Sequence, residues 1–213
     1  MKIKQIAQIA LVSVVPLAAA TDASAATIIA DTVIEFFDSG AGSFTGTRPY
    51  GGTFDGSIGT FPVEVPLSYA TDGDITTFVS LPTGSFIILG FSTGFVFDGP
   101  GLDIFVAEVG GNDELADIFV SSDFGLTFTF LGQATTATVS GFDLADIGFT
   151  GQVNAIKIVG LDNFGGSPGF DLAFVQGLEG SVIITEPVPE PGTLTVLSLG
   201  LFGIAAMLRR RRA

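Results

Sequence analysis

The sequence contains no cysteine, no histidine and no tryptophan among its 213 residues. Without cysteine the chain can form no disulfide and offers no thiol nucleophile. Without histidine it lacks the commonest general base and the commonest side-chain ligand of transition metals. We therefore expect that the protein is not an enzyme. A hydrolase that works with two carboxylates is the catalytic alternative that remains.

Basic residues are also scarce. Between residues 26 and 185, nineteen Asp and Glu residues stand against two basic residues, Arg48 and Lys157. This balance disfavours nucleic acids and anionic membrane surfaces as partners, because both are bound through basic patches. An excess of carboxylates instead fits a hard cation such as calcium, or solubility in salty surroundings.

Long apolar runs occur only at the two ends of the chain. The first run, residues 6–20, follows two lysines and precedes Ala23-Ser24-Ala25. A basic start, an apolar stretch and a small-x-small site are typical of a secretory signal peptide. We predict that residues 1–25 are this signal peptide, that it is cleaved between Ala25 and Ala26, and that the remainder is exported.

The second apolar run, residues 194–208, has fifteen residues. As a helix it would be about 22 Å long, which is short for a permanent anchor in a hydrocarbon core of about 30 Å. A run of basic residues follows it, namely Arg209, Arg210, Arg211 and Arg212. Basic residues at this position would keep the C-terminus on the cytoplasmic side of the membrane. A plain short membrane anchor is one interpretation of this segment, and a signal for sorting is the other.

Pro189-Glu190-Pro191, the apolar run and the arginines follow one another within residues 186–213. In this order they resemble the PEP-CTERM sorting signal of Gram-negative bacteria. The resemblance implies that an exosortase-type membrane protease recognises Pro189, Glu190, Pro191 and the arginines and cleaves near the prolines. It also implies that the inner membrane holds the tail only transiently, and that the body reaches the cell surface or its exopolysaccharide matrix.

Residues 26–185 remain as one domain, and their pattern is that of an all-β protein. Short apolar runs alternate with Gly, Asp, Asn and Pro, and no stretch reads as a helical crossover of the length that a parallel sheet needs. We predict an antiparallel β-sandwich. The predicted strands are 27–37, 61–67, 85–91, 102–109, 116–121, 126–131, 135–139, 155–159, 170–175 and 181–185.

One pentapeptide occurs twice, as Gly141-Phe-Asp143-Leu-Ala and as Gly169-Phe-Asp171-Leu-Ala, and Gly101-Leu-Asp103-Ile is a looser copy. The spacing is unequal, so these copies do not indicate a repeat protein. For Asp103 and Asp143 we expect an ordinary role, in which the carboxylate accepts hydrogen bonds from the loop backbone.

The loop Asp72-Gly-Asp74-Ile-Thr-Thr77 is the strongest candidate for a metal site. Glycine between two aspartates can take a positive φ, which lets carboxylates and carbonyls converge as the oxygen-rich shell of calcium requires. The same tripeptide also makes ordinary turns. The spacing is not that of an EF-hand.

Together with downstream motifs over residues 60–177, this loop resembles galactose-binding-like, discoidin-type jelly rolls. The resemblance implies a jelly-roll sandwich with a structural calcium at Asp72, Asp74 and Thr77, completed by Asp171. Ala173 departs from the family, in which a second acid often stands at that position.

Discoidin-like lectins present an aromatic platform with a polar side chain, and here Arg48 and Tyr50 are the nearest match. Their stacking on a sugar is one interpretation, and an exposed tyrosine in a glycine-rich turn is the other. Asp38-Ser39-Gly40 has the tripeptide of aspartic proteases, but no second copy exists to complete the pair. The sequence thus favours a non-enzymatic surface or matrix protein with a structural or adhesive role. A module that binds exopolysaccharide is the first alternative and a secreted hydrolase the second.

Overall fold

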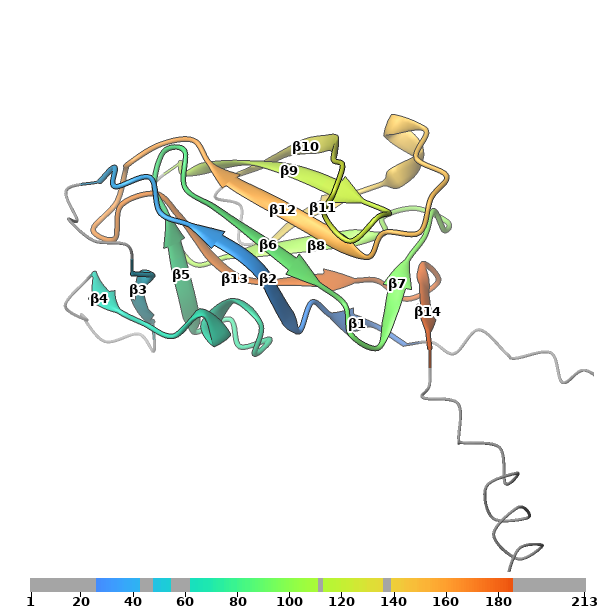
Figure 1. The fold of residues 1–213 in the computed structure, drawn as a ribbon, viewed down its shortest axis with the longest axis horizontal. Coiled ribbons are helices and arrows are strands. Elements are labelled where there is room, and N and C mark those ends of the chain that lie inside the picture. The colour runs from blue at the N-terminus through green and yellow to red at the C-terminus, as the bar shows by residue number, and fades with distance from the viewer. Residues whose placement is uncertain (1–25, 43–47, 55–61, 111–112, 136–138, 186–213) are drawn as a thin grey trace, which may run out of the picture.

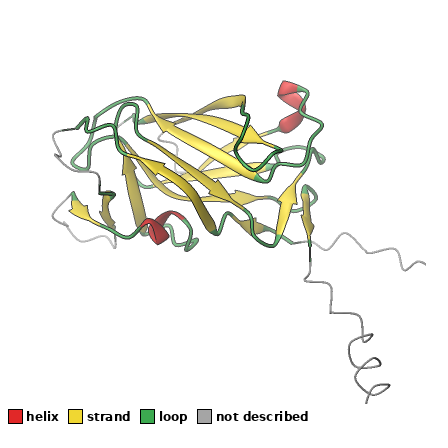
Figure 2. Cartoon of the chain, viewed as in Figure 1, coloured by secondary structure: helices red, strands yellow, loops and turns green. Residues whose placement is uncertain are grey.

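The computed structural model describes residues 26–42, 48–54, 62–110, 113–135 and 139–185 (Figure 1). Within these ranges the chain is built from antiparallel strands with two short 3-10 helices, η1 (Leu67–Ala70) and η2 (Leu144–Ile147) (Figure 2). The predicted all-β class is confirmed. The signal peptide 1–25, the sorting segment 186–213 and its apolar run 194–208 lie outside the described residues. Inside them, no helix has the length and apolarity to cross a membrane.

Two large sheets make up the sandwich. One has the order β11 (Val139–Phe142), β8 (Ile104–Glu108), β13 (Phe170–Gly177), β5 (Thr77–Leu81), β3 (Tyr50–Thr53), β4 (Val63–Glu64), with β1 (Ile28–Ile29) also paired to β13. The other has the order β10 (Thr129–Thr135), β9 (Leu115–Ser121), β12 (Ala155–Gly160), β6 (Phe86–Gly90), β2 (Thr32–Phe37). A small third sheet pairs β14 (Val182–Ile184) with β7 (Gly94–Val96).

The core lies between the two large sheets. Alternate residues of each strand point inward, as Ile118 and Val120 of β9 show, while Asp117 and Phe119 face outward and are only partly buried. The buried cluster joins side chains of both sheets, among them Ile87, Leu89, Ile156 and Ile158 from one and Val79, Leu81, Ile104, Val106 and Leu172 from the other. Each such side chain contributes about 1.5–3 kcal/mol of burial free energy.

Several predicted strand boundaries were wrong. The predicted strand 27–37 is two strands in different sheets: the N–H of Ala30 bonds to Val175 O in one sheet, and the N–H of Asp31 bonds to Gly90 O in the other. The backbone therefore changes sheets between these two residues. The sequence of this segment does not show such a switch, because apolar residues of similar kind stand on both sides of Asp31.

The predicted strand 126–131 was also misplaced at its start. Of the predicted strand 135–139, residues 136–138 lie outside the described residues. Residues 126–128 belong to a turn, because Asp123 accepts hydrogen bonds from the backbone and hydroxyl of Thr127. β10 begins only at Thr129 and continues to Thr135, and β11 begins at Val139. Only a small part of the predicted strand 61–67 is a strand in the structure. β4 covers Val63–Glu64, and η1 begins at Leu67 directly after Pro66.

Loops from both sheets meet at one end of the sandwich, which we call the distal end. It lies at the left in Figure 1, opposite β7 and β14. Hydrogen bonds tie its loops together: Gly84 N to Gly160 O, Thr83 N to Asn163 Oδ1, and Leu115 N to Asp162 Oδ2. The distal end thus brings together segments that are distant in sequence.

Candidate functional site

A narrow hollow lies at the distal end, and we call it the distal hollow. Its volume is about 10 Å³, which is room for about one water molecule or one hydroxyl group. Its lining consists of Phe36, Asp38, Ala41, Arg48, Tyr50, Ser80, Pro82 and Pro168. The structure therefore brings the two predicted sugar-binding residues, Arg48 and Tyr50, to one concave surface. Most of the lining is apolar, with a few polar groups, which is the usual composition of a small-molecule site.

Asp38 is the polar group of this hollow that sequence reasoning missed. Its Oδ1 accepts a hydrogen bond of 2.9 Å from the N–H of Gly40. Its Oδ2 is buried and has no hydrogen-bond partner among the described residues. A buried acceptor without a donor is costly, and a ligand that supplies a hydroxyl or amine removes that cost. The tripeptide Asp38-Ser39-Gly40 suggested only a protease match, and nothing local in it shows this burial.

Arg48 reaches across the β3–β4 pair to Glu64. Its Nη1 lies 2.9 Å and 2.7 Å from the two carboxylate oxygens of Glu64. The bonds to Glu64 raise the pKa of Arg48 above its usual range. Both side chains are more than half exposed, so the pair adds little to stability. Its effect is to fix the guanidinium beside the hollow, next to Tyr50, whose Cα is the register partner of Glu64.

Ser80 and Pro168 connect the hollow to a buried carboxyl group behind it. The Ser80 hydroxyl donates to Asp171 Oδ1, and Ser80 Oγ and Ser167 Oγ are also within hydrogen-bond distance. Asp171 is 7% exposed, and its burial raises its pKa well above the usual value despite the bond from Ser80. The back wall of the hollow is therefore ordered by a polar network.

The predicted calcium loop has the expected local shape. Gly73 has a φ of +72°, and Asp72 accepts hydrogen bonds from Asp74 N at 2.9 Å and from Thr77 Oγ1 at 2.9 Å and 3.0 Å. Asp74 Oδ1 accepts from the N–H and the hydroxyl of Thr76, which lowers the pKa of Asp74. Both aspartates are exposed and accept bonds from their own loop, so the loop fits a turn as it stands and would have to exchange these bonds to hold an ion.

Asp171 does not join this loop. In the β5–β13 pair, Asp171 lies opposite Ser80, three residues beyond Thr77 along β5. The predicted four-residue set is therefore divided by the register of the two strands. Calcium binding at Asp72, Asp74 and Thr77 stays a prediction.

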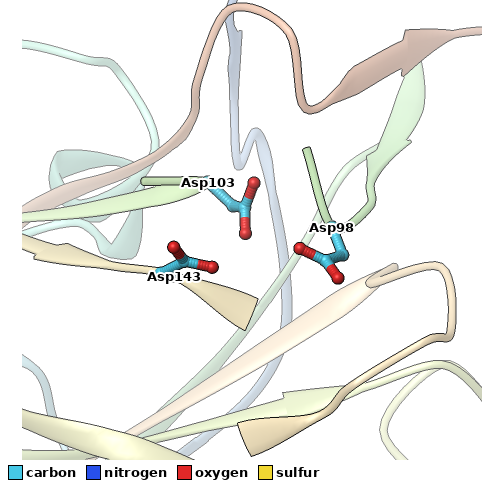
Figure 3. A group of neighbouring side chains, drawn as sticks. All are labelled: Asp98, Asp103 and Asp143. Atoms are coloured by element: carbon cyan, nitrogen blue, oxygen red, sulfur yellow. The ribbon is translucent and has the colours of Figure 1, made fainter. Parts of the chain in front are cut away.

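A different group of three carboxylates does converge. Asp98, Asp103 and Asp143 each place a carboxylate oxygen within 4.8 Å of the others (Figure 3). Asp103 is fully buried, and it accepts from Gly99 N at 2.9 Å, from Leu144 N at 2.7 Å and from the Ser181 hydroxyl. Asp143 accepts from Ala145 N at 2.8 Å and caps η2. The expected role of Asp103 and Asp143 as acceptors for loop backbone is confirmed.

A second hollow lies at the end opposite the distal hollow. Its volume is about 260 Å³, and it is lined by Phe91, Ser92, Gly94, Phe95, Phe124, Gln152, Asn154 and Thr185. Among the described residues, the buried side-chain atoms without a hydrogen-bond partner belong to Asp38, Glu108 and Glu114, and none of these lines this second hollow. The second hollow is therefore the larger of the two, and the distal hollow is the one that contains an unpaired polar group.

Comparison with known proteins bears on the two parts of the chain separately. Residues 187–212 match the family model of the PEP-CTERM protein-sorting motif. The predicted sorting signal is confirmed. The motif indicates export and exosortase-dependent sorting towards the cell surface. No curated protein matches the chain.

Among solved structures, the chain is similar to the C-terminal domain of a chitobiase from Bacteroides fragilis, with 16% identity, 71% of this chain and 94% of that chain covered, and a TM-score of 0.43. It is also similar to truncated AlyQ with CBM32 and alginate lyase domains, at 13% identity and a TM-score of 0.43, covering 78% of this chain and 36% of that one. A third is the CBM32 of AlyQ in complex with 4,5-unsaturated mannuronic acid, at 16% identity, 50% and 81% coverage and a TM-score of 0.38. All three TM-scores are below 0.5. We therefore assign the sandwich from the strand order of its sheets and not from these similarities.

Proposed function

We propose that the exported domain is displayed outside the cell and binds a carbohydrate over the mouth of the distal hollow, which admits one hydroxyl group of the sugar, without catalysis. The observation that supports this proposal is the buried, unpartnered Oδ2 of Asp38 in a hollow lined by Phe36 and Tyr50. A sugar ring offers hydroxyl donors on its edge and C–H groups on its faces. The donors suit the carboxylate of Asp38, and the faces suit the aromatic rings.

The charge of the domain narrows the class of carbohydrate. Residues 26–185 carry nineteen acidic side chains and two basic ones, and the guanidinium of Arg48 is already engaged by Glu64. A strongly negative surface repels an anionic polymer at ordinary ionic strength. We therefore propose a neutral glycan, such as a hexose-containing exopolysaccharide, as the ligand.

The lining of the hollow favours binding over hydrolysis. Glycosidases use two carboxyl groups, about 5–10 Å apart, on either side of the bond that breaks. Of the described residues that line the distal hollow, only Asp38 carries a carboxyl group. The carboxyl group of Asp171 lies behind Ser80 and is buried. The proposed role is therefore to hold the protein to a glycan, in keeping with its sorting towards the cell surface and its matrix.

A glycan array tests this proposal with the full chain in a mild detergent. Asp38→Asn keeps the shape of the side chain and replaces one acceptor oxygen by a donor, so binding to the captured glycan should fall at least tenfold. Tyr50→Ala should also weaken binding. Asp98→Asn, at the opposite end of the sandwich, is the matched control and should bind as the unchanged protein does. Retention of full affinity in both Asp38→Asn and Tyr50→Ala would exclude the distal hollow as the site.

A further inference from the structure

Four carboxyl groups gather inside the distal end, apart from the lining of the hollow. They belong to Glu108 at the end of β8, Glu114 directly before β9, Asp162 after β12 and Asp171 in β13. Glu108 and Glu114 are each 1% exposed. In the sequence the two glutamates flank Val-Gly-Gly-Asn-Asp, a glycine-rich polar segment that does not indicate buried carboxyl groups.

Glu108 and Glu114 are buried without donors. Both carboxylate oxygens of Glu108, and Oε2 of Glu114, have no hydrogen-bond partner among the described residues. Asp103 is a useful contrast, because it is equally buried and receives three hydrogen bonds. Native proteins pair buried carboxylates almost without exception. Glu108 and Glu114 lie close enough to share one proton, and a cation between them would satisfy both carboxylates in place of that proton.

The oxygens of the two glutamates converge over one glycine. A methyl group at Gly110 would lie 2.5 Å from Glu108 Oε1 and 3.3 Å from Glu114 Oε2. Both carboxylates therefore pack against the backbone of Gly110, and a side chain at this position would displace them. Carboxylate oxygens that converge in this way are the ligands that a hard cation prefers.

No basic side chain neutralises this cluster. Of the two basic residues that the structure describes, Arg48 is paired with Glu64, and Lys157 Nζ lies 4.0 Å from the centre of the Phe86 ring. Burial, with the neighbouring carboxylates Asp162 and Glu108, raises the pKa of Glu114 to about 8, and burial raises that of Glu108 to about 7. A positive charge between the two carboxyl groups would stabilise their ionised forms and so offset the free-energy cost of burying them.

We propose that Glu108 and Glu114 bind a hard divalent cation, calcium by its preference for carboxylate oxygen, at the distal end of the sandwich. Asp162 and Asp171 are the nearest further carboxyl groups, and their negative charge adds to the attraction. The site is separate from the loop of Asp72, Asp74 and Thr77, and it does not depend on the proposed glycan binding.

Such an ion would order the loops that build the hollow. Asp162 already holds the start of β9 through Leu115 N at 2.6 Å and its own loop through Phe164 N at 3.1 Å. Asp171 is bonded to Ser80, which lines the hollow and contacts Ser167, the neighbour of Pro168. Neutralising the cluster therefore stabilises the segments on which the hollow depends.

The test is a calcium titration of the full chain in a mild detergent, after removal of metal with a chelator, followed by calorimetry and by thermal melting at pH 7.5. A calcium concentration of a hundred times Kd should raise Tm by about 5–10 °C. Glu108→Gln and Glu114→Gln should each abolish this shift. Glu35→Gln and Glu179→Gln, at exposed positions outside the acidic groups, are the matched controls and should keep it.

Two results would overturn the proposal. One is the absence of calcium binding by calorimetry in the unchanged protein, which would mean that the two glutamates share a proton instead. The other is a shift that disappears in Asp72→Asn or Asp98→Asn. Asp72→Asn and Asp98→Asn alter exposed side chains, and we expect both variants to fold. Their calcium-dependent shift in Tm therefore tests the proposal even if a glutamine variant does not fold.

Discussion

The backbone N–H of Leu144 donates a hydrogen bond of 2.7 Å to Oδ2 of Asp103, which lies 41 residues earlier in the chain. Oδ1 of the same carboxylate accepts from Gly99 N and from the Ser181 hydroxyl. Asp103 therefore joins the start of η2, the turn after β7 and the turn before β14. A single buried side chain fixes the end of the sandwich where the described chain leaves it.

Asp103→Ala should be among the most destabilising substitutions in the domain. It leaves buried donors without an acceptor, at about 1–3 kcal/mol each, so we expect the free energy of unfolding to fall by at least about 3 kcal/mol. Asp143→Ala removes one capping bond from a partly exposed residue and should cost only about 1 kcal/mol. Urea denaturation measures both. Equal losses in the two variants would contradict the role given to Asp103.

The two copies of the Gly-Phe-Asp-Leu-Ala pentapeptide should respond differently to alanine at the glycine. Gly169 has a φ of +96°, and a methyl group there would lie 2.3 Å from the backbone oxygen of Leu81. Gly169→Ala should therefore lower the free energy of unfolding by more than about 2 kcal/mol. At Gly141 the nearest atoms are the side-chain ends of Leu102 and Phe105, which can move. We expect Gly141→Ala to cost about 1 kcal/mol or less, and chemical denaturation of the pair tests the difference.

Phe124 is held in a strained backbone conformation. Its φ is +59°, its side chain is 72% exposed, and its N–H bonds to Asn154 Oδ1 at 2.8 Å. Asparagine tolerates this region of φ better than phenylalanine, so Phe124→Asn should raise the free energy of unfolding by about 0.5–1 kcal/mol. Leu126→Asn, at a nearby position that is 84% exposed and is not among the residues with a positive φ, is the control and should change stability little. A loss of stability in Phe124→Asn would show that its ring packs in a way that its exposure does not indicate.

The buried glutamates predict a dependence of stability on pH in chelator. Burial raises the pKa of Glu108 to about 7 and that of Glu114 to about 8, above the unfolded value of 4.5. The charge of Glu108 also acts on Glu114, and that of Asp162 acts on both. Between pH 4.5 and about pH 8 the folded state binds more protons than the unfolded state, so the free energy of unfolding falls as pH rises. Tm in chelator should therefore decline from pH 5.5 to pH 8. Calcium affinity should rise over the same range, because the ion displaces protons.

The double variant Glu108→Gln, Glu114→Gln provides the control for this profile. It removes two of the carboxyl groups whose pKa is raised and leaves Asp171, so its Tm should decline less between pH 5.5 and 8 than the Tm of the unchanged protein. A decline of the same size in the double variant would assign the pH dependence to carboxyl groups elsewhere in the domain.

Alternation of apolar and polar residues was sufficient to predict the all-β class. β9 and β12 were placed within a residue or two, because their inward side chains are aliphatic along their whole length. β3 was missed because two of its four residues, Gly51 and Gly52, have no side chain to form a pattern. At Gly51 a methyl group would lie 2.0 Å from Phe78 O, so glycine there reflects the close approach of β5 and not a turn.

Identical local sequence also led to different structures. Gly141-Phe-Asp143 ends a strand and caps η2, whereas Gly169-Phe-Asp171 begins β13 and buries its carboxyl group against Ser80. The difference is set by the strand that lies opposite each copy, which the pentapeptide does not encode. For the same reason Asp171 could not be placed relative to Asp72, and the burial of Glu108 and Glu114 could not be predicted.

The distal hollow was predicted in part. Arg48 and Tyr50 were selected because an aromatic ring beside a guanidinium suits a sugar, and the structure places them in one hollow. Asp38, Ser80 and Pro168 come from other segments, and they join the site only through the loops at the distal end. The sorting signal, by contrast, is a linear motif, and its sequence was sufficient to identify it.

The most direct measurement of the central claim is the affinity of the full chain and of its Asp38→Asn variant for a neutral exopolysaccharide, by affinity electrophoresis with calcium present. The proposal predicts that the polysaccharide retards the unchanged protein and the Asp98→Asn control equally, and that Asp38→Asn loses at least tenfold in affinity. Equal retardation of Asp38→Asn and the unchanged protein, or no retardation of either by any neutral glycan, would contradict it.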